Sequence, residues 1–197
     1  MEDFESYNIE EEKVARRHTM WSLVPRIMVS PLSGWEATRK SGPNPVVAIL
    51  RFLLPICLLA GGSEFFTLLY QVQVSLPDLM VNSVVVFFSY FLGYYISLLL
   101  AKLILPAVSK DFPLTDYGRL LTIASIGTLA FYRILFQAFP MFDFIIEFFP
   151  LWTVFLIYKG MKIADIDPDR SAFSMGVMCV VIICSPSLVE WILSLFT

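Results

Sequence analysis

The sequence predicts an all-α membrane protein, a bundle of five transmembrane helices preceded by short helices at the membrane interface. Composition is the first reason: of 197 residues, 57% are hydrophobic, 15% are aromatic and only 16% are charged, whereas about 25% of residues are charged in soluble domains. A chain with this much apolar surface does not stay solvated as a disordered polymer either. The other two reasons are five long apolar stretches and the positions of the basic residues.

Residues 1–45 are predicted to form a cytoplasmic, acidic tail. No basic segment followed by an apolar run begins the chain, so we expect no cleavable signal peptide. Between residues 20 and 29, apolar side chains recur at helical spacing, with Arg26 on the opposite face. This pattern predicts a short amphipathic helix in the headgroup layer, with Trp21 at the interface.

A second short helix is predicted to follow in the tail. Ser33 and Glu36 have the spacing of a capping box, which opens a helix. The glycine and prolines of residues 42–45 are typical of a helix end. We expect Trp35, near the start of this helix, to lie at the membrane interface, where tryptophan is enriched.

Residues 46–197 are predicted to form the transmembrane domain. A spanning helix needs about 20 mostly apolar residues, and five stretches qualify, at about 46–70, 79–104, 118–139, 143–162 and 172–196. The third and fourth spans must be joined by a very tight hairpin, for which Pro140 and Asp143 supply suitable turn residues.

The basic residues orient these spans, because cytoplasmic loops keep most of the Lys and Arg of a membrane protein. Thirteen of the 14 basic residues fall before or just inside the first span, in the second-to-third connection or in the fourth-to-fifth connection. They are Lys13, Arg16, Arg17, Arg26, Arg39, Lys40, Arg51, Lys102, Lys110, Arg119, Lys159, Lys162 and Arg170. The N-terminus is therefore expected in the cytoplasm and, after five crossings, the C-terminus outside.

Four ionisable residues inside the predicted spans are expected to share one layer in the outer half of the bilayer. They are Glu64, Arg133, Glu147 and Glu190. Arg133 and Glu147 each lie seven residues from Pro140, so an antiparallel hairpin predicts a salt bridge between them. Charged groups are costly in a membrane and are candidates for function. Two interpretations remain open: a structural cluster that holds helix register, or a site for a cation, a proton or a lipid headgroup.

Small residues recur every four positions on the second predicted span. Ser89, Gly93, Ser97 and Ala101 form one continuous strip, which lets another helix backbone approach closely. The strip predicts either a contact between helices of one chain or an interface between copies in a homo-oligomer.

No catalytic or metal-binding pattern is expected. His18 is the one histidine, and Cys57, Cys179 and Cys184 all fall in apolar runs without metal-ligand spacing. A Ser/His or Cys/His constellation within the spans would need a second histidine. The formal net charge of −3 gives no basic field for nucleic acid. We expect neither an enzyme, nor a cofactor, nor a nucleic-acid partner.

The stretch Ile27-Met-Val-Ser-Pro31-Leu-Ser-Gly-Trp35 before five spans, with the positive charge inside, resembles the Yip1 family of integral membrane proteins. The resemblance implies an all-α five-helix bundle. Eukaryotic members look like non-enzymatic adaptors that bind Rab-type GTPases and one another. The tail here lacks their Asp-Leu-Tyr-Gly-Pro type stretch and has only Ser41-Gly42-Pro43 nearby, which favours a prokaryotic member in the bacterial cytoplasmic membrane.

Two functions follow as hypotheses. The first is a membrane adaptor or organiser, with the lipid bilayer around it and membrane or peripheral proteins as partners. The alternative is a small permease or channel that uses the charged layer in the outer half. Helix breaks at Pro55, Pro150 and Pro186 are compatible with the alternative.

Overall fold

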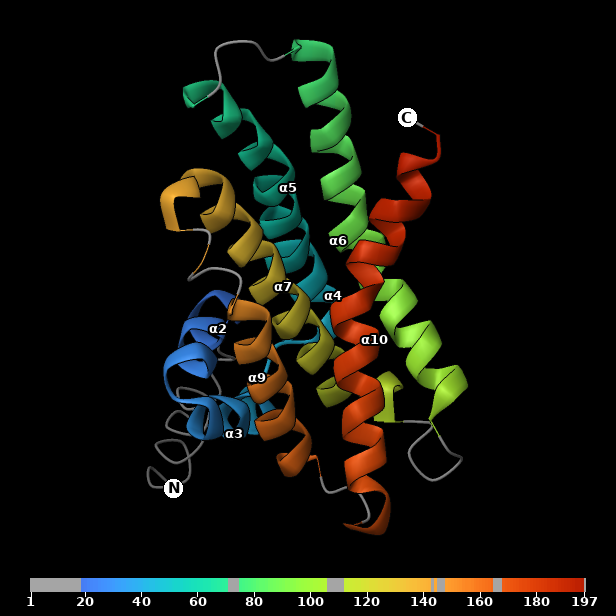
Figure 1. The fold of residues 1–197 in the computed structure, drawn as a ribbon. Coiled ribbons are helices and arrows are strands. Elements are labelled where there is room, and N and C mark those ends of the chain that lie inside the picture. The colour runs from blue at the N-terminus through green and yellow to red at the C-terminus, as the bar shows by residue number, and fades with distance from the viewer. Residues whose placement is uncertain are drawn as a thin grey trace, which may run out of the picture.

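The computed structural model describes residues 19–70, 75–105, 112–142, 144, 148–164 and 168–196, and the secondary structure in these ranges is all helical (Figure 1). Four helical segments among them are long and apolar enough to cross a membrane: Pro45–Leu69, Leu76–Ile104, Asp116–Ala138 and Ala172–Ser194. They correspond to the first, second, third and fifth predicted spans. The predicted all-α class is confirmed.

The segment predicted as the fourth span, at 143–162, differs from the prediction. Its helix in the described part of the chain, α9, covers Phe149–Ile163 and has 15 residues. At 1.5 Å per residue, α9 is about 22 Å long, less than the hydrocarbon core of a bilayer. Pro140–Phe142 forms a short 3-10 turn, η4, at the predicted hairpin. Asp143 lies outside the described residues.

The first span is built from four helical pieces of different pitch. It runs through α4 (Pro45–Ala48), the π-helical η1 (Ile49–Leu53), α5 (Leu54–Gly62) and the 3-10 helix η2 (Ser63–Leu69). Pro55 has no N–H to give to the carbonyl of Arg51 four residues earlier. Trp21 supplies the missing donor, because its Nε1 lies 2.7 Å from the Arg51 oxygen. The helix break caused by Pro55 thus becomes an attachment point for the tail.

The tail helix α2 (Met20–Val29) forms where the sequence predicts it, but its apolar face packs against protein rather than lipid. Met20, Leu23, Val24 and Ile27 are all buried. Gly34 of the next helix, α3 (Pro31–Ser41), makes this close packing possible. A Cβ atom at Gly34 would come within 2.6 Å of the Ile27 backbone.

Two expectations about α3 are wrong. Pro31 starts the helix with Ser30 as its N-cap, because proline is favoured in the first turn, where its missing N–H is not needed. Ser33 therefore lies inside the first turn and cannot open a capping box. Trp35 is 0% exposed instead of lying at the interface. Its Nε1 donates to the carbonyl of Leu156 at 2.9 Å.

The small-residue strip lies inside the molecule, between α6 (Leu76–Ile104) and α10 (Pro168–Ser194). Ser89, Ser97 and Ala101 are buried. A Cβ added to Gly93 would meet the backbone of Pro186 on α10 at 3.2 Å. The strip is therefore a contact between helices of one chain, and α10 covers it against use as an interface between copies.

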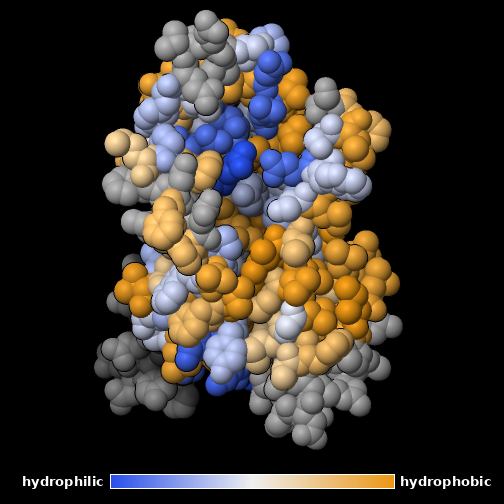
Figure 2. Space-filling view, in the orientation of Figure 1, coloured by the Kyte–Doolittle hydropathy of each residue, from blue (hydrophilic) through white to orange (hydrophobic). Residues whose placement is uncertain are grey.

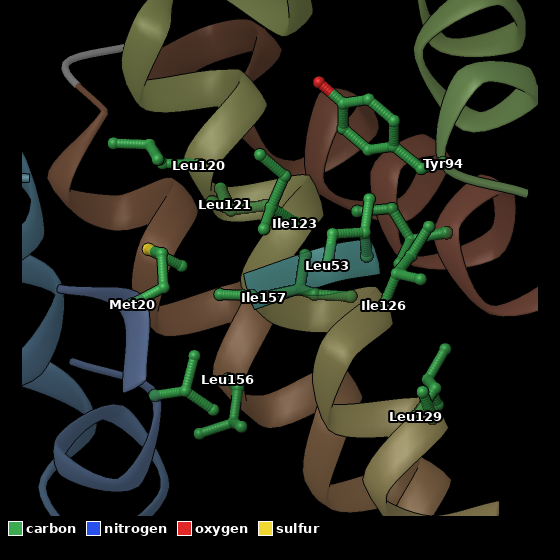
Figure 3. Close-up of a cluster of buried hydrophobic side chains, with 14 of the residues drawn as sticks. Met20, Leu53, Tyr94, Leu120, Leu121, Ile123, Ile126, Leu129, Leu156 and Ile157 are labelled. Atoms are coloured by element: carbon green, nitrogen blue, oxygen red, sulfur yellow. The ribbon is translucent and has the colours of Figure 1, made fainter. Parts of the chain in front are cut away.

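Helix α7 (Asp116–Ala138) lies at the centre of the bundle, and most of its apolar side chains are buried. Figure 3 shows Leu121, Ile123 and Ile126 of α7 among side chains from the first span, α6 and α9. The neighbouring side chains in this view include Leu53, Tyr94, Leu156 and Ile157. The core thus joins the crossing helices to α9 and, through Met20, to the tail.

Replacing Trp35 by alanine should destabilise the fold by about 3–5 kcal/mol, because it removes a fully buried aromatic ring and its hydrogen bond. Thermal unfolding of the purified chain in detergent measures the effect. Trp191→Ala is the matched control, since Trp191 is 62% exposed on the outside of the bundle. Equal melting temperatures for the two variants would contradict the placement of Trp35.

Candidate functional site

An ion pair joins the first span to α7. Arg133 of α7 donates to Oε1 of Glu64 on η2 through Nη2 at 2.8 Å and through Nε at 3.1 Å. Gln137, one helical turn after Arg133, donates to the same oxygen from Nε2 at 3.0 Å. Three donors therefore converge on one carboxylate oxygen.

Burial makes this pair energetically important. The side chain of Glu64 is 7% exposed and that of Arg133 is 29% exposed. A charge removed from water without a partner costs several kcal/mol, and hydrogen-bonded pairing offsets this cost. Glu64 and Arg133 thus depend on each other, and each favours the approach of η2 to α7.

Glu190 of α10 joins the cluster more loosely. Its Oε1 lies 3.9 Å from Nη2 of Arg133, and its side chain is 43% exposed. Tyr90 of α6 lines the same cavity as Arg133. Residues from the first span, α6, α7 and α10 therefore contribute to one charged cluster. Among the described residues this cluster contains one cation and two carboxylates.

Three of the four residues predicted to share a layer are thus brought together. The fourth, Glu147, lies outside the described residues, and so does the predicted salt bridge between Arg133 and Glu147. The partner that the structure gives Arg133 is Glu64, which is 69 positions away in the sequence.

A cavity of about 270 Å³ opens beside Arg133, between α6, α7, α9 and α10. Apolar side chains form most of its wall, and its polar groups belong to Tyr90, Tyr132, Arg133 and Ser187. In Figure 2, hydrophilic residues gather in the upper half of the face shown, bordered by hydrophobic ones. The arrangement is a polar recess in an apolar surface.

A second polar cavity, of about 440 Å³, lies at the opposite end of the bundle. The end of α3 and the start of α4 form one side, including Arg39, Lys40 and Asn44, and Asp116 and Tyr117 of α7 form the other. The cavity holds both signs of charge. Its walls are firmly held, because Tyr117 donates to the carbonyl of Gly160 at 2.9 Å and Arg39 donates to the carbonyl of Ile163.

The other predicted interfacial residues lie on the surface. Trp21 is 47% exposed, and Arg26 is exposed next to Pro25 in α2. In the described ranges, no group of three His, Cys, Asp or Glu side chains is placed to hold a metal ion. The cysteines Cys57, Cys179 and Cys184 are free thiols.

Two of these polar residues, Gln137 and Ser187, are not predicted from the sequence. A signal for Gln137 was present, because Arg133 and Gln137 are four residues apart and so share one face of a helix. Ser187 carries no such signal. It lines the cavity because Pro186 packs against Gly93, which is a tertiary contact.

A double-mutant cycle tests the ion pair. Arg133→Gln should cost about 3 kcal/mol of stability, because it leaves the Glu64 carboxylate buried without its cation. Adding Glu64→Gln should recover part of that loss, since the double variant buries no unpaired charge. Chemical unfolding of the four proteins in detergent measures the coupling. Strictly additive losses would show that the two side chains do not interact.

Comparisons of the chain with models of protein families, with curated proteins and with solved structures found no match. The resemblance to the Yip1 family therefore stays an expectation from the sequence.

Proposed function

We propose that this chain is a Yip1-like integral membrane protein of five crossings that acts as a non-enzymatic adaptor or organiser. The single observation that carries the proposal is the polar cavity at the end of the bundle where α3 meets α7. There the tail is packed rigidly onto the membrane domain and presents basic, acidic and amide groups side by side. A surface of this kind suits a protein partner.

The course of the chain supports a fourth crossing. In Figure 1, α7 ends towards the upper end of the molecule and α10 begins at the lower end. The chain must therefore run from the upper to the lower end of the bundle between α7 and α10. Helix α9 forms the lower part of this segment. The 15 residues of α9 then form the cytoplasmic part of this crossing.

The distribution of charge supports the orientation. Lys40, Lys102, Arg119 and Lys162 belong to the helix ends on the tail side of the bundle. Arg133 is the described exception, and Glu64 pairs with it. The positive-inside rule then puts the N-terminus in the cytoplasm and the C-terminus outside, in what we propose is a bacterial cytoplasmic membrane.

Single cysteines in a background with the three native cysteines replaced by serine test this topology. A membrane-impermeant maleimide added to intact cells should label Ser75→Cys, at the start of α6, and leave Lys40→Cys and Lys162→Cys unlabelled. All three should react after the membrane is opened. Labelling of Lys162→Cys in intact cells would contradict the fourth crossing.

A photo-crosslinking residue at Lys40 or at Asp116 tests the adaptor function. Both positions should capture the same cytoplasmic or membrane protein in living cells, because they line one cavity. The same residue at Trp191, on the exposed outside of α10, is the matched control. Lys40→Glu should weaken capture from position 116 by reversing a charge in the cavity. Identical capture from all three positions, or none from 40 and 116, would argue against an adaptor that uses this surface.

A small permease is the second candidate. The specific observation in its favour is the cavity lined by Arg133, a cation that also contacts the two carboxylates of Glu64 and Glu190. Ion or proton flux into liposomes that contain the purified chain distinguishes the two functions. A permease requires flux that falls in Glu190→Gln, whereas an adaptor gives none above empty liposomes.

A further inference from the structure

A much larger apolar groove lies next to the cavity beside Arg133, and the buried ring of Tyr132 separates the two. The groove has a volume of about 910 Å³ and lies between the end of α2, the outer half of α7 and the first turns of α9. Tyr132 lines both the polar cavity and the groove. Polar and apolar binding surfaces thus meet at one side chain.

The charges of the cluster select the kind of ligand. The described residues place two carboxylates around one guanidinium. A simple anion would be repelled by the carboxylates, and a simple cation by Arg133. A group that carries both signs is complementary: its negative end fits Arg133 and Tyr90, and its positive end fits Glu190.

The contacts that Arg133 and Glu190 already make leave room for such a ligand. Nε and Nη2 of Arg133 bind Glu64, whereas the third nitrogen, Nη1, takes no part in those two bonds. Glu190 is half-exposed, and its 3.9 Å contact with Arg133 is too long for a hydrogen bond. Glu190 can therefore accept a bond from an ammonium group without breaking the buried pair.

The apolar groove beside the charged cluster favours a lipid as the ligand. The side chains of the groove include Phe131, Leu151 and Trp152, all large apolar groups that are partly exposed on the outside of the bundle. In Figure 1, the end of α7 also lies lower than the upper ends of α5 and α6. Short segments thin the bilayer locally, which brings lipid headgroups down towards the level of Arg133.

We infer that the polar cavity, the neighbouring Glu190 and the groove together bind one phospholipid with a zwitterionic headgroup that ends in a primary ammonium, of the phosphatidylethanolamine type. The phosphate binds Arg133 and the Tyr90 hydroxyl, the ammonium donates to Glu190, and an acyl chain lies along the groove past Tyr132. A quaternary ammonium, as in phosphatidylcholine, has no N–H to donate to Glu190. This inference goes beyond the proposed adaptor function and does not rest on it.

Native mass spectrometry of the full chain, released from detergent micelles that contain equal amounts of phosphatidylethanolamine, phosphatidylglycerol and phosphatidylcholine, tests the inference. The complex with one phosphatidylethanolamine should dominate. Glu190→Gln should lower the affinity for this lipid about tenfold, the value of one charge-assisted hydrogen bond, and leave the affinity for phosphatidylglycerol unchanged or raised. Asp78→Asn, which removes an exposed carboxylate at the start of α6, is the matched control and should change neither affinity.

Tyr90→Phe provides an independent variant, because it keeps the ring and removes only a donor to the phosphate. It should lower the affinity for phosphatidylethanolamine and phosphatidylglycerol alike. Equal retention of the three lipids by the natural chain, or unchanged lipid preference in Glu190→Gln, would overturn the inference. Binding of free phosphoethanolamine as tightly as the lipid would also overturn it, since the groove would then contribute nothing.

Discussion

The pairing of Arg133 with Glu64 is the interaction on which the half of the bundle away from the tail depends. Hydrocarbon cannot solvate a charge, so a guanidinium at this depth needs a carboxylate nearby. Glu64 comes from the first span and Arg133 from the central helix α7. The pair therefore sets the distance and rotation between them. Glu190 then approaches from α10 and Tyr90 from α6, so one polar layer joins all four candidate spans.

Proline and glycine control the rest of the packing. Pro55 leaves the Arg51 carbonyl open for Trp21, which ties the tail to the first span. A Cβ atom at Gly34 would clash with the Ile27 backbone, and one at Gly93 would lie 3.2 Å from the Pro186 backbone, so both glycines allow helices to pack closely. Pro150 and Pro186 line the polar cavity. The fold is thus closely packed around α7 and hollow where the helices are interrupted, next to the charged residues.

The sequence predicts the fold class and four of the crossings because apolar runs of about 20 residues have few alternatives in a membrane. It also predicts that Glu64, Arg133 and Glu190 lie at similar depth, because depth follows from position along a helix. The rotation of each helix about its axis does not follow from position along the helix. The Arg133–Glu64 bond could therefore not be predicted from residue spacing. The predicted interfacial position of Trp35 is wrong for a related reason, because an amphipathic segment can pack against protein as well as against lipid. The predicted capping box at Ser33 does not form, because Pro31, two residues earlier, already starts the helix.

These observations describe a membrane protein with polar cavities at both ends of its helix bundle: a mixed-charge cavity on the tail side and a recess lined by Arg133 on the opposite side. In this structure Glu64 is paired with Arg133 inside the helix bundle. Infrared difference spectroscopy of the chain in lipid bilayers, with and without Glu64→Gln, tests this pairing most directly. We expect the substitution to remove an ionised carboxylate band. Loss of a protonated carboxyl band instead would contradict it.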